Sequence, residues 1–300
     1  MLDRLPRSRR WLPVLCALAV TASAHARGTD SPCGSSTQAI PERAAHAPGA
    51  RAFIASLASL GDHERDAAIR DELLAGNLPG FLRQVQPVTT IGRLPGGRSV
   101  TLTLCVLSDY LGLGSDRDFL LVPMGLDSAL AVASKFDFML PTRRMVDLIY
   151  RQAAVHLEPQ PLPAGDRMRS TAYLQQHDAL VEQQRSDRGA VPGELTAGHK
   201  KDLVLTERLW QQPGRVAIYG WQHADGSPIQ PLSTVHGARY ADYSHGIRLV
   251  SQTLFVDGRP TRLLDALADR QLAPLLSDEG PLSQASAWLA SRAAGDAGAR

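Results

Sequence analysis

The run Val100-Thr-Leu-Thr-Leu-Cys-Val-Leu107 alternates threonine with leucine before it becomes continuously apolar. Alternation with a period of two residues is typical of a strand that buries one face. A second strand-like run, residues 88–91, precedes it, and Gly96-Gly97 lies between the two runs. Glycines in that place favour a turn, so the sequence predicts a β-hairpin formed by residues 88–91 and 100–107.

Helical spacing of apolar residues surrounds this hairpin in the first half of the chain. Phe53, Leu57 and Leu60 begin a helical region over 52–83, whose second helix is stopped by Asn77-Leu-Pro-Gly80. Further helices are predicted over 128–136, 142–154 and 173–185. After a polar loop at 186–193, the pattern changes to short strands at 203–205, 216–221 and 247–255, followed by a closing helix at 261–272. The expected fold is α+β, with a helical N-terminal half packed on a β-rich C-terminal half.

The first 26 residues have the features of a cleavable secretory signal. Four arginines (Arg4, Arg7, Arg9 and Arg10) precede an apolar run over 11–20, and Ala22-Ser-Ala24 offers a small-x-small cleavage pattern. We therefore expect a secreted or periplasmic protein. The remainder divides into a flexible arm over 27–49, a single α+β domain over 50–275, and a terminal helix with a flexible tail over 276–300.

Composition excludes some partners and leaves one pairing open. The chain has 32 basic and 30 acidic residues, which gives no global bias toward nucleic acid. No segment after the signal is apolar for long enough to span a membrane, so no stable membrane insertion is expected. Cleavage removes Cys16 and leaves Cys33 and Cys105, which either form a disulfide in an oxidising compartment or remain apart, with Cys105 as a buried thiol. The oligomeric state stays open.

Gly198-His-Lys-Lys-Asp202 is the first group of residues that carries chemistry. If this segment is extended, His199 and Lys201 share one face while Lys200 and Asp202 share the other. The group is able to polarise a carbonyl or hold an anion; the alternative is an exposed charged turn that leads into a strand.

Tyr219-Gly-Trp-Gln-His223 is the second group, and Asp225-Gly226 supplies a hairpin turn after it. Strand alternation would place Tyr219, Trp221 and His223 on one face, where two aromatic rings and an imidazole suit a sugar or a peptide. Aromatic packing between strands in the core is the alternative.

The densest group is His236-Gly-Ala-Arg-Tyr-Ala-Asp-Tyr-Ser-His-Gly-Ile-Arg248. Histidine serves as an acid or a base near neutral pH, and a glycine after it allows close approach of a ligand to the backbone. Grouped titratable residues are typical of functional sites. We therefore expect this segment to contribute His236, Tyr240, Asp242, Tyr243, Ser244, His245 and Arg248 to a site.

Part of this segment resembles a known enzyme signature. His236-Gly237, followed by Ser244-His-Gly-Ile-Arg-Leu249, is similar to the motif of L,D-transpeptidases, which has His-Gly, then Ser-His-Gly-Cys, then Ile/Val-Arg. Gly246 is followed here by Ile247, so the nucleophilic cysteine of that family is absent, and the resemblance implies no transpeptidase activity. Residues 198–202, 216–221 and 242–248 together resemble a family of exported microbial proteins of unassigned function.

The leading hypothesis is an exported hydrolase that acts on cell-wall peptide or glycan without a catalytic cysteine. His236 or His245 would be the base, Asp242 or Asp202 would orient it, and Ser244 or an activated water would be the nucleophile. A carboxylate or developing oxyanion would be held by Lys201 and Arg248. The catalytic candidates are His199, His236, Asp242, Ser244 and His245, and the substrate-binding candidates are Lys201, Tyr219, Trp221, His223, Tyr240, Tyr243 and Arg248.

Two alternatives remain open at this stage. A metal-dependent hydrolase would use His199, Asp202, His236 and His245 as candidate zinc ligands, although no HExxH motif or close Cys/His spacing supports a resident cofactor. A non-catalytic protein would bind a sugar or wall fragment through its aromatic residues. The small-molecule or polymer partner is the same in all three hypotheses.

Overall fold

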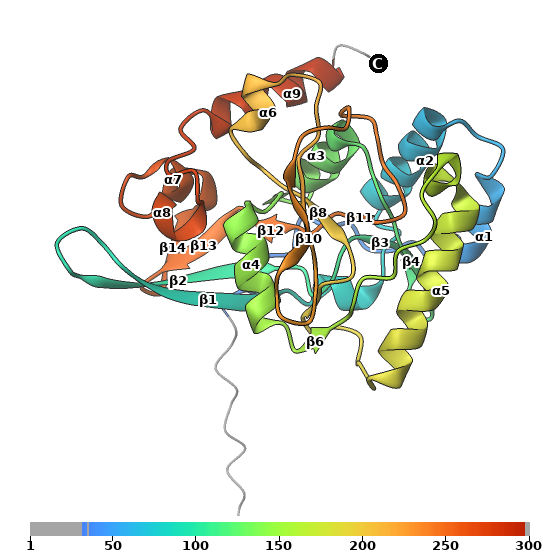
Figure 1. Cartoon of the computed structure of the whole chain (residues 1–300), viewed down its shortest axis with the longest axis horizontal. Helices are drawn as coiled ribbons and strands as arrows, with labels where there is room; N and C mark the ends of the chain where they lie inside the picture. The colour runs from blue at the N-terminus through green and yellow to red at the C-terminus, as the bar shows by residue number, and fades with distance from the viewer. Residues whose placement is uncertain (1–31, 35, 298–300) are drawn as a thin grey trace, which may run out of the picture. The chain divides into compact units, whose positions relative to one another are not determined.

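The computed structural model describes residues 32–34 and 36–297 (Figure 1). The predicted signal, residues 1–26, lies outside the described residues, and so does the start of the predicted arm. Among the described residues, no helix combines the length and the hydrophobicity needed to cross a membrane.

The predicted hairpin forms the centre of the larger sheet. β1 and β2 pair antiparallel from Gln86↔Val106 to Arg93↔Ser99, and Leu102 and Leu104 are fully buried. Further strands extend this sheet in the order β14-β13-β2-β12-β5, with β1 paired to β2. Its strands are β1 (Gln86–Arg93), β2 (Ser99–Val106), β5 (Phe138–Met139), β12 (Val250–Ser251), β13 (Thr253–Val256) and β14 (Arg259–Arg262).

A second sheet, of order β10-β9-β8-β11, carries most of the polar segments singled out in the sequence. Its strands are β8 (Lys201–Leu203), β9 (Ile218–Gln222), β10 (Pro228–Ser233) and β11 (His245–Gly246). β11 pairs parallel with β8, which places His245 opposite Lys201. Two ribbons complete the strands: β3 (Gly112–Ser115) with β4 (Asp118–Leu121), and β6 (Val155–His156) with β7 (Thr196–Ala197).

Helices lie on either side of these sheets. α1, α2 and α5 gather on the right of Figure 1, and α7 and α8 lie beside β13 and β14 on the left. Thr142 and Ser170 cap α4 and α5 by accepting the backbone N–H groups of Met145 and Tyr173, as N-cap residues do. The helices are α1 (Ala50–Ser56), α2 (Asp62–Leu74), α3 (Leu126–Lys135), α4 (Arg143–Gln152), α5 (Thr171–Asp187), α6 (Arg208–Gln211), α7 (Leu263–Ala268), α8 (Ala273–Leu276) and α9 (Ala285–Ala297), with 3-10 turns η1 (Gly80–Arg83) and η2 (Asp166–Arg169).

The N-terminal half is mostly helical and the C-terminal half is rich in strands, so the predicted α+β class is confirmed. The boundaries near the C-terminus differ from the prediction. Asp257 and Gly258, both at positive φ, form a turn between β13 and β14, where the sequence analysis expected the closing helix to begin a few residues later. Residues 261 and 262 therefore belong to a strand, and the helix starts at Leu263.

The described part of the N-terminal segment is attached to the domain. Cys33 and Cys105 form a disulfide, which joins the segment to β2. Farther along, Arg83 donates hydrogen bonds to the carbonyl oxygens of Ile40 and Pro41, and Ile40 itself is buried. The pairing that the sequence left open is thus the disulfide.

Candidate functional site

Residues 198–203 separate two groups of polar side chains. Gly198 has a φ of 104°, and a Cβ at this position would lie 2.6 Å from the carbonyl oxygen of Leu157, so glycine is needed there. β8 begins only at Lys201. The turn before it sends His199 to one side of the segment and Lys201 to the other, so the shared face predicted for these two residues is wrong.

The group on the Lys201 side is named the histidine cluster and consists of Lys201, Trp221, His236, Tyr240, Asp242 and His245. His236 and Tyr240 stack with their rings nearly parallel and their centroids 4.1 Å apart. The His245 ring lies 6.1 Å from His236 and 5.7 Å from Tyr240. His236 and Tyr240 are partly exposed while His245 is fully buried, so the stacked pair forms the solvent side of the cluster.

Asp242 forms the floor of the histidine cluster. Its Oδ1 accepts hydrogen bonds from the backbone N–H of Ser244, at 2.8 Å, and from the Ser244 hydroxyl, at 2.5 Å. Its Oδ2 lies 3.8 Å from Nε2 of His245, and neither ring nitrogen of His245 has a hydrogen bond among the described residues. Ser244 is fully buried and its hydroxyl is committed to Asp242 rather than to a histidine.

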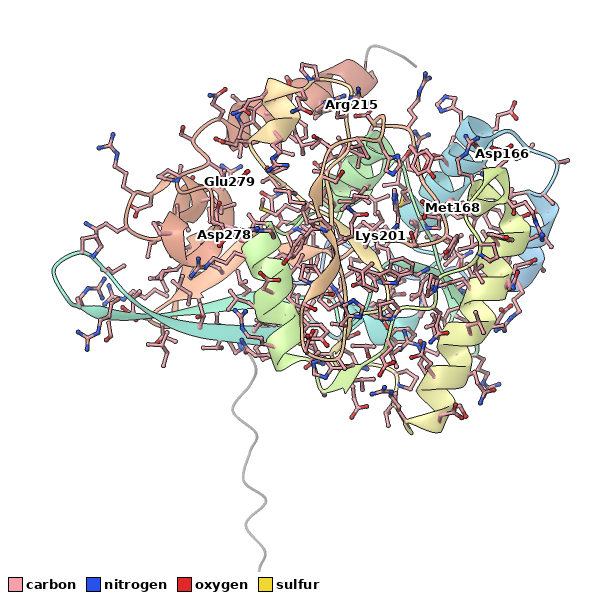
Figure 2. The ribbon with its side chains drawn as sticks, viewed as in Figure 1. Asp166, Met168, Lys201, Arg215, Asp278 and Glu279 are labelled. Atoms are coloured by element: carbon pink, nitrogen blue, oxygen red, sulfur yellow. A yellow bond between two sulfur atoms is a disulfide. The ribbon has the colours of Figure 1, made fainter. Side chains whose placement is uncertain are left out.

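Lys201 and Trp221 close the other side of the histidine cluster. The Lys201 ammonium, labelled near the middle of Figure 2, lies 4.7 Å from the centroid of the Trp221 ring. Trp221 has a φ of 57°, a conformation that is costly for a bulky residue and is often found at functional sites. The strain is held in place by β9 and by a hydrogen bond from the Trp221 N–H to the carbonyl oxygen of Lys200.

The surroundings move the pKa values of this cluster in opposite directions. Burial lowers the pKa of His245, and burial likewise lowers the pKa of His236, so both imidazoles are neutral at neutral pH. Burial and the charge of Asp242 raise the pKa of Tyr240 to about 12, which keeps its phenol protonated. Burial opposes ionisation of Asp242, but His245, Ser244 and Lys201 together lower its pKa. The cluster thus holds proton acceptors beside a proton donor.

His199 belongs to the second group, centred on Asp109. Asp109 accepts a hydrogen bond from Arg185, and its other oxygen lies 3.4 Å from Nε2 of His199. Although burial opposes it, Arg185 and His199 hold the pKa of Asp109 well below its usual range. Burial lowers the pKa of His199 to about 4. Sequence reasoning gave no role to Asp109 or Arg185, which lie 76 residues apart.

Asp202 lies on the same side as His199. Its Oδ2 accepts a hydrogen bond from the Tyr110 hydroxyl at 2.9 Å, and the Tyr110 ring meets the ring of His199 edge-on. Lys200 is buried between the two groups and donates a 2.6 Å hydrogen bond to the carbonyl oxygen of Tyr243. Burial lowers the pKa of Lys200 to about 8.

Three further candidates have structural partners away from the histidine cluster. Tyr219 donates to Asp147 on α4, and the Tyr243 hydroxyl accepts the N–H of Leu162. His223 is exposed in the loop after β9. The predicted common face of Tyr219, Trp221 and His223 is wrong because positive φ angles at 220 and 221 break the alternation of the strand.

Arg248 is the fourth candidate outside the histidine cluster. Its guanidinium is buried, donates to the carbonyl oxygens of Leu107 and Thr196, and lies over the Tyr110 ring with 4.3 Å to the centroid. These contacts hold backbone segments together and leave no guanidinium at the histidine cluster. The expectation that Arg248 and Lys201 hold one substrate group together is therefore wrong.

The four candidate zinc ligands do not meet. His199 and Asp202 lie around Tyr110, whereas His236 and His245 lie in the histidine cluster. Within residues 32–34 and 36–297, no group of three or more His, Cys, Asp or Glu residues is arranged to hold a metal ion. Neither a protein-family model, nor a curated protein, nor a solved structure matches the chain.

Proposed function

We propose that this protein is an exported hydrolase that activates water at the histidine cluster, with a cell-wall peptide or glycan as substrate. The observation that carries the proposal is the stacked pair of His236 and Tyr240 at the solvent side of a buried Asp242–His245 floor. A neutral imidazole lies beside a protonated phenol, and this is the pairing that general acid–base catalysis requires.

The roles follow from exposure and charge. His236 is partly exposed and takes a proton from water, whose oxygen then forms a bond to the reacting carbon of the substrate. Tyr240 gives its proton to the leaving group as the scissile bond breaks, and Lys201 stabilises the negative charge that develops. His245 and Asp242 hold the stacked pair from below. Ser244 orients Asp242, and water is the nucleophile because the Ser244 hydroxyl is buried.

Substrate-panel assays test the proposal directly. The purified protein is incubated with soluble wall peptides and glycans, and mass spectrometry detects products that have gained one water. We expect His236→Gln and His245→Gln to lose about 10²–10⁴-fold in turnover while retaining the fold. His223→Asn, in an exposed loop, is the matched control and should keep full activity. Full activity in His236→Gln or His245→Gln refutes the proposed site.

A second candidate function, non-catalytic binding of a wall fragment, is supported by the partly exposed Tyr240 ring. The other aromatic candidates are buried: Trp221 is 5% exposed, and Tyr219 and Tyr243 have partners elsewhere. Tyr240→Phe separates the two functions because it keeps the ring stacked on His236 and removes only the acidic proton. A hydrolase loses turnover in this variant, whereas a binding protein shows no turnover in either form and keeps its affinity.

A further inference from the structure

A cavity of about 200 Å³ lies on the other side of residues 198–203 from the histidine cluster. α5 contributes Glu182 and Arg185 to its wall, and Asp109 lies beneath Arg185. The opposite wall is apolar, because Phe81 and Phe119 pack edge to face there with their centroids 5.0 Å apart. The cavity thus combines charged and aromatic walls in a space that suits a small ligand.

Two buried polar atoms of this cavity lack hydrogen bonds. Nε of Arg185 lies 3.0 Å from Oε1 of Glu182, but the two do not form a hydrogen bond, and neither atom has another partner among the described residues. Arg185 is only 12% exposed, so its Nε–H has little access to solvent. A buried donor without an acceptor is costly, which favours a ligand that supplies one. The same ligand would supply a donor to Oε1 of Glu182.

The charge of the cavity selects the kind of donor. Arg185 is already paired with Asp109, which leaves the carboxylates of Glu182 and Glu194 without a matching cation on the cavity wall. A cationic donor complements this excess of negative charge. Since the Arg185 and Glu182 atoms are neighbours, the cationic donor and the acceptor of the ligand must be neighbours as well. An α-ammonium group next to a carbonyl meets this requirement.

We propose that this cavity binds an α-amino acyl group, with its ammonium on Glu182, its carbonyl oxygen on Nε of Arg185, and its side chain against Phe81 and Phe119. A free amino acid and the N-terminal residue of a peptide share this chemistry. The proposed binding does not depend on the hydrolase activity of the histidine cluster. It assigns a ligand to Arg185 and Glu182, which the hydrolase mechanism does not use.

Calorimetric titration of the full protein tests the proposal with four related probes. Leucinamide and leucine carry both the ammonium and the carbonyl, N-acetylleucinamide lacks the ammonium, and 3-methylbutylamine lacks the carbonyl. We expect saturable binding of leucinamide, leucine or both, and weaker binding of the two incomplete probes by about tenfold or more, as for loss of one charged hydrogen bond. Preference for leucinamide identifies a peptide N-terminus as the natural ligand, and preference for leucine identifies a free amino acid.

Glu182→Gln locates the binding. The substitution keeps the shape of the side chain and removes its charge, so leucinamide affinity should fall about tenfold or more. Glu158→Gln, an exposed glutamate outside the cavity, is the control and should bind as the wild type does. Unchanged melting temperatures confirm that both variants fold. Equal binding of an incomplete probe, unchanged affinity in Glu182→Gln, or no saturable binding of any probe overturns the proposal.

Discussion

Reduction of the Cys33–Cys105 disulfide should remove a large part of the stability of this domain. The bond joins residues separated by 72 positions, and both cysteines are buried. A cross-link stabilises a protein chiefly by restricting its unfolded chain, and the loss of entropy grows with the length of the closed loop. For a loop of this length, the chain-entropy relation gives about 4 kcal/mol at 25 °C. That value is a considerable fraction of the ~5–15 kcal/mol that stabilises a typical domain.

Urea unfolding followed by tryptophan fluorescence measures this effect. The free energy of unfolding is determined with and without a reductant, for the wild type and for a Cys33→Ala/Cys105→Ala variant. The wild type should lose about 4 kcal/mol on reduction. The variant should resemble the reduced wild type and should not respond to the reductant. A loss below about 1 kcal/mol, well under the range for native disulfides, would show that the bond contributes little to stability.

Three further predictions concern the buried polar groups. Arg248→Met removes the guanidinium that holds the carbonyl of Leu107 and should lower the free energy of unfolding by about 3–5 kcal/mol in a urea titration; a change below about 1 kcal/mol contradicts the structural role. Burial raises the pKa of Asp202 to about 7 from 3.8, so the folded state binds the proton more tightly and stability falls as pH rises from about 4 to about 7. Asp202→Asn should abolish that fall, and thermal unfolding across this pH range detects it; parallel profiles for variant and wild type refute the assignment. Ser244→Ala removes one hydrogen bond to Asp242 and should reduce turnover on any identified substrate only about tenfold, whereas complete loss would make the serine the nucleophile.

Local pattern predicted the regular elements of this fold and failed for its shortest ones. The alternation over 100–107 and the glycines at 96 and 97 were enough to place the β1–β2 hairpin, because its two strands are neighbours in the chain. β5, β11 and β12 have two residues each, too few for any periodicity to show. Their existence depends on pairing with distant strands, which a single sequence does not reveal.

The site was predictable where its residues are close in sequence. The density of His236, Tyr240, Asp242 and His245 pointed to residues that the structure brings together. The same density also included Arg248, which is a buried structural group, because residue type alone does not distinguish a buried guanidinium from an accessible one.

Asp109 and Arg185 were missed because they meet only through tertiary packing. A signal for this contact was nevertheless present in α5. His177, Asp178 and Val181 are buried on this helix, and Glu182 and Arg185 continue the same helical spacing toward Asp109. A helix that turns histidine and charged residues toward the interior is unusual and indicates a polar partner there.

The pairing of Lys201 with His245 makes the length of one short segment critical. Lys200 and Lys201 are chemically alike, yet one ammonium is held in the interior by Tyr243 and the other lies in the histidine cluster. Adding or deleting one residue after Gly198 would exchange their places and move Asp202 as well. Drift in chain length should therefore be tolerated at the open tip of the hairpin, near Gly96 and Gly97, and be lethal to activity at 198–203. In this segment the count of residues, more than their chemistry, determines which lysine serves the reaction.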